Sequence, residues 1–322
     1  MEPAKMTLTA RTPDDLLAMV PVVLGFVPED SLVMLTFGAG RTFHARVDLP
    51  PRAQHVDEVI NALLEPAVRH RVERAVFLAY SDDVGWAEEV TGRVRAAFRR
   101  RGIGVIGRIA ADGRRWWALP LETGDPGTPY DVSAHPFAAQ AVLHGLVTHR
   151  SRDELSATLA PDPGGVSAVE RALSARPVLR GEHLVAESAW AVAFVRRCVA
   201  DGVRPDAEAT ARLLVGLLDP GVRDAVWTTM SRGEAIPFVE LWTDVVRRAP
   251  ASHLAAPAAI LGFAAWLAGH GALAWCAADR SREADPDHPL ARLLAESLAA
   301  AVPPSAWDEM SAGRGRGPGR PA

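Results

Sequence analysis

Hydrophobic and polar positions change their spacing along the chain, and this change divides it into two parts. In the first part, segments with helical spacing alternate with short apolar runs that are typical of buried strands. The predicted helices cover residues 13–24, 56–68 and 84–100, and the predicted strands cover residues 31–37, 43–49, 72–80, 103–109 and 115–121. After residue 133 the strand patterns stop, and consecutive helical segments separated by Pro and Gly are expected as far as residue 300.

These patterns predict an α/β N-terminal domain followed by an all-α domain of helical hairpins. A glycine-rich turn at residues 38–40 joins the first two strands, which should therefore form a hairpin. The strand–helix–strand order over residues 72–109 predicts a βαβ unit with parallel strands, so the sheet is mixed, with about five strands. We place the domains at residues 1–135 and 136–309, followed by a disordered Gly/Arg/Pro tail at 310–322.

Composition bears on the compartment more than on the fold. The chain has 322 residues, of which 48% are hydrophobic and 23% charged, as in ordinary globular proteins. Cys198 and Cys276 fall in apolar helical segments, which favours buried thiols in a reducing compartment over disulfides. The longest apolar stretch, residues 254–269, is too short to span a membrane and contains Pro257. We therefore expect a cytoplasmic protein with no membrane contact.

Lysine is almost absent from the chain, and this excludes several mechanisms. Of 35 Lys and Arg residues only Lys5 is lysine, which leaves 34 arginines. A P-loop requires a lysine in its glycine-rich loop, and a Schiff-base enzyme requires a lysine nucleophile, so neither is expected. The net charge of −4 predicts no general attraction to nucleic acid, which would require the arginines to cluster on one face. We expect no nucleic-acid partner.

Sequence motifs that bind cofactors or metals are missing, or they occur between the wrong kinds of secondary-structure element. Gly102, Gly104 and Gly107 match the pattern G-x-G-x-x-G, but this pattern follows a predicted helix and enters a strand. Dinucleotide sites have the opposite order, so Gly102 is better explained as a left-handed helix cap. Histidines and cysteines show no zinc spacing, and no nucleophile elbow occurs. We predict no cofactor and no metal.

The second predicted strand carries the most informative polar pattern. His44, Arg46 and Asp48 alternate with apolar residues, so the three polar side chains share one face of the strand. One interpretation is a face of the sheet that is exposed to solvent. The other is a polar cluster at a cleft, in which Arg46 is available to a small anionic ligand.

Polar residues next to two other strands complete the candidate set. Asp82 follows the third strand, where parallel sheets bind ligands, although Asp82 or Asp83 would also serve as the cap of the next helix. Asp30 and Ser31 precede the first strand and form either part of a site or an Asx-type turn. The candidate ligand-binding residues are therefore Asp30, Ser31, Arg46, Asp48 and Asp82. For Trp116 and Trp117, core packing is preferred over stacking on a base or sugar.

Segments along most of the chain together resemble the actinobacterial family known as domain of unknown function 4192. The matching segments are residues 13–18, 20–21, 24–33, 46–50, 213–214, 223–225, 241–242, 256–257, 261–267, 271–274 and 284–288. The resemblance implies the architecture but no activity, because none is established for the family. Relatives often have cysteines in the loop after the Trp-Trp pair, whereas residues 121–136 have none here.

A weaker resemblance concerns one helical hairpin near the C-terminus. Leu261, Gly262, Ala274, Ala278 and Pro286 have the spacing of a single tetratricopeptide-like repeat, with alanines in place of its bulky residues. We therefore expect a non-catalytic regulatory or scaffold protein that binds a ligand through its α/β domain and another protein through its helical domain. The alternative is a hydrolase acting on a phosphorylated or nucleotide-like small molecule, which requires the five candidate side chains to converge.

Overall fold

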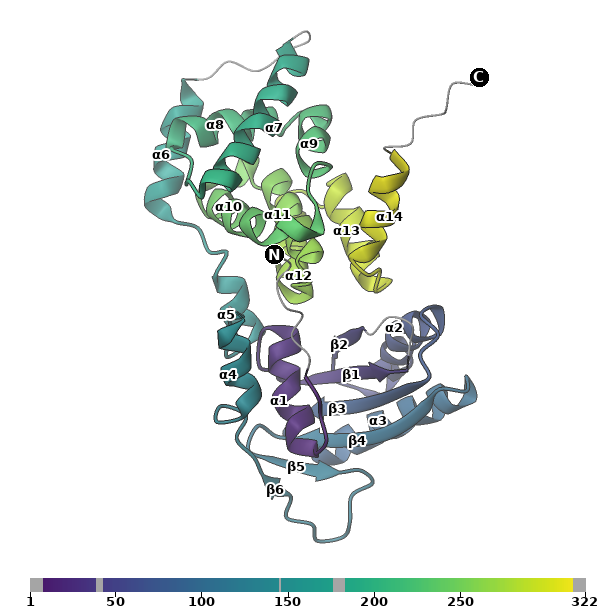
Figure 1. Cartoon of the computed structure of the whole chain (residues 1–322). Helices are drawn as coiled ribbons and strands as arrows, with labels where there is room; N and C mark the ends of the chain where they lie inside the picture. Colours follow the sequence, from purple (N-terminus) through teal and green to yellow (C-terminus); the bar gives the residue numbers. More distant parts are fainter. Residues whose placement is uncertain (1–7, 39–42, 145, 176–182, 315–322) are drawn as a thin grey trace, which may run out of the picture. The chain divides into compact units, whose positions relative to one another are not determined.

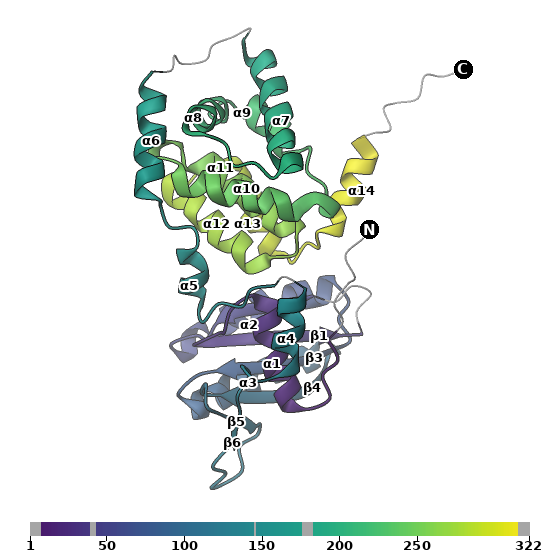
Figure 2. The ribbon, with the colours of Figure 1, turned by 60° about the vertical axis from the view of Figure 1, so that its left-hand side comes forward.

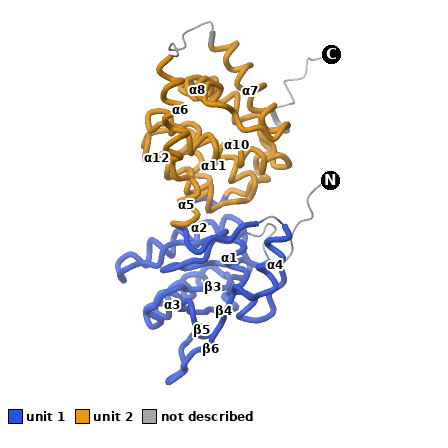
Figure 3. The backbone as a smooth tube through the Cα atoms, turned by 90° about the vertical axis from the view of Figure 1, so that its left-hand side faces the viewer, with its two compact units in different colours: residues 1–152, 299–301 blue, residues 153–298, 302–322 orange. Residues whose placement is uncertain are grey.

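The computed structural model describes residues 8–38, 43–144, 146–175 and 183–314, and the chain divides into two compact units. Unit 1 comprises residues 1–152 with 299–301, and unit 2 comprises residues 153–298 with 302–322 (Figure 3). The domain boundary placed after residue 135 precedes helix α4 (Pro136–Leu143), whose Phe137 packs in a core of unit 1. The compact units instead divide after Arg152.

Unit 1 is built on a mixed sheet whose described strands have the order β2-β1-β3-β4-β5-β6 (Figure 1). The strands are β1 (Ser31–Phe37), β2 (His44–Asp48), β3 (Arg74–Tyr80), β4 (Gly104–Ala111), β5 (Arg115–Ala118) and β6 (Thr128–Pro129). β1 is antiparallel to β2 and to β3, whereas β3 and β4 are parallel. The predicted hairpin and βαβ unit are therefore confirmed; the turn between β1 and β2 lies outside the described residues from position 39 to 42.

β6 is the strand that the sequence pattern missed. It has only two residues, both exposed, and pairs antiparallel with β5 inside the stretch predicted as a loop. Such a short segment with a proline carries no alternating pattern, because its pairing depends on the neighbouring strand rather than on its own side chains.

The helices of unit 1 begin and end at residues that can cap a helix. They are α1 (Pro13–Leu24), α2 (Val56–Arg69), α3 (Val84–Arg100) and α4. Thr12 caps α1 by accepting a hydrogen bond from the backbone N–H of Asp15, and Gly25 ends it with φ of 80°. Gly102 has φ of 77° just after α3, which confirms its role as a cap rather than as part of a dinucleotide loop. Gly104 and Gly107 belong to β4.

Two apolar cores cover the two faces of the sheet. Leu32, Met34 and Phe77 pack with α2 and α3 on one face. Val33 and Leu35 pack with α1 and with Phe137 of α4 on the other face, where α1 and α4 lie together (Figure 2). Because β1 and β3 are buried on both faces, their sequences are continuous apolar runs rather than alternating ones.

The edge strand β2 is covered on one face only, and this explains its alternating pattern. Ala45 and Val47 pack against the core formed with α2 and α3. His44, Arg46 and Asp48 therefore project from the opposite face, the one on which α1 lies. His44 and Arg46 are half-buried and Asp48 is exposed, so this face is more than a plain solvent-exposed surface.

Unit 2 is helical throughout its described residues. Its helices are α5 (Arg152–Ala157), α6 (Pro163–Ser174), α7 (His183–Asp201), α8 (Ala207–Gly216), α9 (Pro220–Trp227), α10 (Ala235–Arg248), α11 (Ala255–Leu267), α12 (Gly271–Ala284), α13 (Pro289–Ala299) and α14 (Ser305–Arg314). α10, α11 and α12 pack as consecutive neighbours, as expected for hairpins, whereas α6 packs on α8 and α7 on α9. The predicted fold class, an α/β domain followed by a helical one, is confirmed. None of the described helices combines the length and apolar character needed to cross a membrane.

Helix α14 begins at Ser305 and extends into the segment for which the sequence predicted disorder, residues 310–322. Low complexity hides the helix, but Trp307 is buried beside Trp227 and Phe263 and donates a hydrogen bond to the carbonyl of Met230 over 2.9 Å. This ring and the ion pair between Arg232 and Asp308 over 2.7 Å hold the helix against the unit. The helix continues to Arg314, and the rest of the predicted tail, residues 315–322, lies outside the described residues.

Candidate functional site

Four of the five candidate residues lie at one end of the sheet, and Arg46 lies close to it. The four are Asp30, Ser31, Asp48 and Asp82. Ser31, the first residue of β1, pairs with Asp48 at the end of β2 and with Tyr80 at the end of β3. We call this end, where the parallel strands β3 and β4 finish, the carboxyl end of the sheet. Asp82 follows Tyr80 by two residues, so it belongs to the same end. Arg46, opposite Val33, lies one pleat away from it.

Arg46 is the centre of the only contacts found among the candidates in the described part of the chain. Its Nε donates a hydrogen bond to Ser31 Oγ over 2.9 Å, and its terminal nitrogen forms an ion pair with Asp48 over 2.6 Å. The guanidinium carbon lies 6.0 Å from the centre of the Phe26 ring. The Arg46 side chain is 17% exposed, whereas that of Asp48 is 80% exposed. Three contacts from three segments therefore fix the direction of a side chain that is still partly exposed.

The segment that carries Phe26 is itself held in place by a distant part of unit 1. The backbone N–H of Val27 donates to the carbonyl of His149 over 2.9 Å, and the N–H of His149 donates to the carbonyl of Gly25 over 2.8 Å. This isolated bridge joins the loop after α1 to the loop after α4. The position of the Phe26 ring beside Arg46 therefore depends on His149, which lies more than a hundred residues after Arg46 in the sequence. No local sequence pattern indicates this contact.

The pKa of the Arg46 guanidinium is affected by burial and by two neighbouring charges. Partial burial lowers the pKa of the guanidinium, the Asp48 carboxylate opposes this, and the charge of Arg152 lowers that pKa further. An arginine remains a cation at neutral pH even so. The field of Arg152 reaches the same guanidinium, so an anion there would be attracted by more than one positive charge.

Ser31 is fully buried, and its hydroxyl is committed to structure. Its Oγ donates to the carbonyl of Glu29 and accepts from Arg46 Nε. A serine nucleophile requires a base that removes the hydroxyl proton, and neither of these two partners is one. The hydroxyl therefore positions Arg46 rather than attacking a substrate.

Asp30 and Asp82 are exposed and do not join the Arg46 cluster. Asp30 has φ of 40°, and its carbonyl accepts a hydrogen bond from the N–H of Leu49 over 2.8 Å, which closes the end of the hairpin. Asp83 rather than Asp82 caps α3, because its carboxylate accepts from the N–H of Trp86 over 2.9 Å. The structure therefore brings Ser31, Arg46 and Asp48 into contact, whereas Asp30 and Asp82 share only the same end of the sheet.

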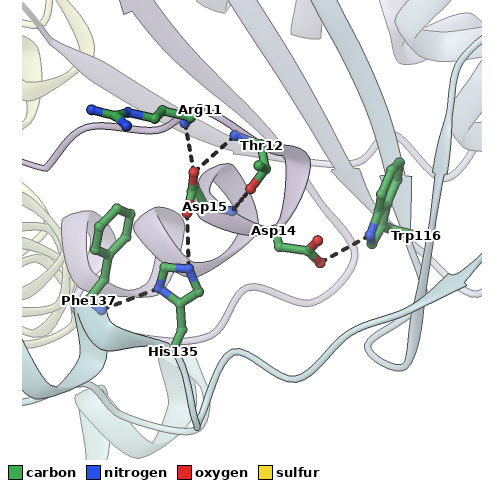
Figure 4. Close-up of polar contacts among 7 residues, drawn as sticks. All are labelled: Arg11, Thr12, Asp14, Asp15, Trp116, His135 and Phe137. Atoms are coloured by element: carbon green, nitrogen blue, oxygen red, sulfur yellow. Dashed lines mark hydrogen bonds and ion pairs between the residues drawn. The ribbon is translucent and has the colours of Figure 1, made fainter.

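A second polar cluster, which the sequence did not reveal as one, links α1 to α4 and β5 (Figure 4). Asp15 accepts hydrogen bonds from the backbone N–H groups of Arg11 and Thr12 over 2.7 and 2.9 Å. Its other carboxylate oxygen lies 3.1 Å from His135 Nε2. The only local signals are the capping box of α1 and the position of His135 just before a proline-started helix.

Both ring nitrogens of His135 are occupied in this cluster. Nδ1 accepts a hydrogen bond from the N–H of Phe137 over 3.2 Å, so the proton of the neutral ring lies on Nε2, which faces Asp15. The backbone hydrogen bond from Arg11 is the largest cause of the lowered pKa of the Asp15 carboxyl, and His135 adds to it. A general base needs a free nitrogen, and this imidazole has none, so the Asp–His pair serves as a clamp between helices.

The tryptophans of β5 lie on opposite sides of their strand. Trp116 packs against the core beneath α1 and donates its ring N–H to Asp14 over 3.2 Å (Figure 4). Trp117 donates to the carbonyl of Asp125 over 3.2 Å, and its ring covers Gly127, where a Cβ atom would lie 2.4 Å away. Trp116 therefore packs against a core of unit 1, whereas the half-buried Trp117 packs on the loop that carries Gly127.

Metal and thiol chemistry find no assembled site in the described ranges. No group of three or more His, Cys, Asp or Glu side chains there is placed to hold a metal ion. Cys198 and Cys276 are buried and are not joined in a disulfide, and burial raises the pKa of Cys198. A raised pKa lowers the fraction of reactive thiolate, so Cys198 is not an activated nucleophile.

Comparison with known proteins gives a family and no further relatives. Neither a curated protein nor a solved structure matches the chain. One family model, described as Domain of unknown function (DUF4192), matches residues 13–305. The match begins at the first residue of α1 and extends to the first residue of α14, and so includes all the candidate residues and both units. The chain therefore belongs to the DUF4192 family.

Proposed function

We propose that this DUF4192 protein is a non-catalytic regulatory or scaffold protein of the cytoplasm. Its α/β unit would bind a small anionic ligand at Arg46, and its helical unit would bind another protein. The observation that carries the proposal is the held guanidinium: Ser31, Asp48 and the Phe26 ring fix Arg46 while part of it stays exposed. Such preorganisation reduces the side-chain entropy that binding would otherwise cost.

The charges around Arg46 define the class of ligand. Arg46 and the field of Arg152 suit a phosphate or carboxylate group. Asp30 and Asp82 are exposed carboxylates at the same end of the sheet, and they accept hydrogen bonds from hydroxyl or amino groups. A molecule that carries one anionic group and several hydroxyls, such as a nucleoside monophosphate, matches this combination.

Supporting observations for the compartment and the protein partner come from unit 2. Both cysteines are buried and not joined in a disulfide, which suits a reducing compartment. Val185, Leu218 and Leu293 are exposed apolar side chains on unit 2, with relative exposures of 80%, 59% and 52%. Exposed aliphatic groups of this kind supply the apolar contacts from which protein interfaces are built.

Calorimetric titration of the full chain with adenosine monophosphate and with inorganic phosphate tests the ligand site. The nucleotide should bind, and Arg46→Ala should weaken its binding about tenfold or more, because a charge-assisted hydrogen bond is lost. Arg46→Lys keeps the charge but loses the planar guanidinium. Its affinity for the nucleotide should therefore lie between those of the unaltered protein and of Arg46→Ala.

Arg93 offers a matched control for this experiment. Like Arg46, Arg93 forms an ion pair with an exposed aspartate: it contacts Asp57 over 3.0 Å. Arg93 lies on α3, whereas Arg46 lies on β2. Arg93→Ala should leave nucleotide binding unchanged. Absence of binding to the unaltered protein, or equal binding by the Arg46 and Arg93 variants, would contradict the proposed site.

The alternative function, hydrolysis of a phosphorylated or nucleotide-like molecule, has a direct assay. Release of phosphate from the same nucleotide by the full chain, abolished in Asp48→Ala, would favour the hydrolase. The commitment of the Ser31 hydroxyl to Glu29 and Arg46 argues for binding without turnover.

A further inference from the structure

The end of the sheet opposite the carboxyl end collects arginines from three segments. Arg71 follows α2, Arg74 begins β3, and Arg99, Arg100 and Arg101 lie at the end of α3. All five side chains are exposed. We call these five residues the arginine patch.

Backbone contacts show that these segments lie side by side. The N–H of Gly104 donates to the carbonyl of Glu73 over 2.8 Å, which joins the chain entering β4 to the chain entering β3. Arg74 pairs with Gly104 in the sheet register, and its Cγ lies 3.5 Å from the position that a Cβ on Gly104 would take. Because α2 and α3 both run from the carboxyl end towards the starts of β3 and β4, both helices finish at this end (Figure 1).

The patch is not neutralised by neighbouring acids. No ion pair to any of the five arginines is present within the described ranges of the chain. Glu73, the acid between Arg71 and Arg74 in the sequence, is turned towards Gly38: a Cβ on that glycine would lie 2.7 Å from its Oε2. The local charge is therefore strongly positive although the whole chain carries −4. Charges farther away than a Debye length of about 8–10 Å have little effect on it.

Helix dipoles account for only part of this arrangement. The last turn of a helix favours cations, which suits Arg99 and Arg100 in α3. Arg71 lies beyond α2 with φ of 52°, and Arg74 lies in a strand, so the dipole gives no reason for either.

We propose that the arginine patch binds the phosphate backbone of double-stranded nucleic acid without sequence preference. Guanidinium groups bind phosphate oxygens in a bidentate manner, and five of them side by side can contact several successive phosphates. Val72 and Ile103, which separate the arginines along the chain, are buried. Val68 and Ile106, the exposed aliphatic residues near these segments, are 44% and 57% exposed, but neither is an aromatic anchor of the kind on which protein interfaces are generally centred. The proposal departs from the expectation based on net charge, because the clustering that nucleic-acid binding requires is local.

Fluorescence anisotropy with a labelled random-sequence DNA duplex of about 20 base pairs tests the proposal on the full chain. Binding should weaken with added salt, and the plot of log K against log salt should have a slope of about −4, because each phosphate contact contributes about −0.9. The triple variant Arg99→Ala, Arg100→Ala, Arg101→Ala should bind at least about tenfold more weakly at about 50 mM salt and lose about 3 from the slope.

A second triple variant controls for net charge. Arg11→Ala, Arg52→Ala, Arg114→Ala removes the same charge from exposed positions of unit 1 outside the patch. It should retain nearly all of the affinity and the slope. Equal losses in the two triple variants, or no binding by the unaltered protein at low salt, would overturn the proposal.

Competition distinguishes nucleic acid from an acidic polypeptide. Unlabelled duplex should displace the labelled duplex better than polyglutamate does at the same total charge. If polyglutamate competes as well or better, the patch recognises carboxylates on a protein, and the proposal for nucleic acid is wrong.

Discussion

Arg46 and His135 show how a side chain's partners decide what it can do. Each belongs to a residue type common in active and binding sites, and each lies in a polar cluster of unit 1. His135 has both nitrogens in use, so it holds two helices together. Arg46 is held by its partners while its side chain stays 17% exposed, and on this we base the proposed ligand site. The difference arises from contacts between distant segments and not from the residue types.

His44, on the same face of β2 as Arg46, should make stability depend on pH. Burial lowers the pKa of His44 to about 4, from 6.5 in the unfolded chain, and its Nδ1 has no hydrogen-bond partner among the described residues. Between these two pH values the unfolded chain binds more protons, so stability is full above pH 6.5 and decreases as the pH falls. The decrease should reach at most about 1.4 kcal/mol per pH unit.

Urea denaturation of the unaltered protein and of His44→Gln between pH 8 and pH 4.5 measures this effect. The stability of the unaltered protein should decrease more steeply as the pH falls below 6.5 than that of the variant, because the variant lacks the titrating ring. At pH 8 the ring is neutral in both states, so the difference there reports packing alone. Parallel curves over the whole range would show that His44 is not the responsible group.

At the scale of elements, close contacts between helices depend on residues without side-chain bulk. In the α11–α12 hairpin, a Cβ on Gly262 would lie 2.5 Å from Leu294 Cδ2 of α13 and 3.2 Å from the carbonyl of Ala274. The carbonyl belongs to a helix backbone and cannot move independently. The small residues with tetratricopeptide-like spacing thus have a packing reason within the unit itself.

Gly262→Ala should therefore destabilise unit 2. Overpacking typically costs about 1–3 kcal/mol, which exceeds the gain of about 1 kcal/mol from better helix propensity. Gly271→Ala is the matched control, because Gly271 begins α12 and a Cβ there would meet nothing within 4 Å. Thermal unfolding should show a lower midpoint for the first variant and an equal or higher midpoint for the second. The same midpoint in both would contradict this account of the hairpin.

At the scale of the whole molecule, each unit has its own buried aromatic residues. Phe77 is fully buried in the sheet core of unit 1, and Trp242 is fully buried in unit 2. A large aromatic residue replaced by alanine in a core costs about 3–5 kcal/mol. Stability should therefore divide between the units rather than belong to the chain as one body.

Differential scanning calorimetry tests this division. Phe77→Ala should lower one of two unfolding transitions, and Trp242→Ala should lower the other. Each variant serves as the control for the other, because both remove a large buried ring. A single transition lowered equally by the two variants would show that the units unfold together.

The elements of this protein follow from its sequence, because helices and strands arise from local spacing, caps and apolar runs. The caps of α1, the apolar run of β1 and the βαβ order are all readable from neighbouring residues. β6 and α14 were missed, because one depends on a neighbouring strand and the other on the burial of Trp307. The five candidate residues were named from alternation and position alone, and only the register of β1, β2 and β3 showed which of them meet.

The sequence alone determined the fold class and the family. The tertiary structure decided that Arg46 is held by Ser31 and Phe26, that His135 links two helices, and that the segments carrying five arginines lie at one end of the sheet. The physical reason is sequence separation. Local periodicity encodes which face of an element a residue occupies, whereas charge and hydrogen bonding across elements depend on register and helix direction, which form only when the core packs.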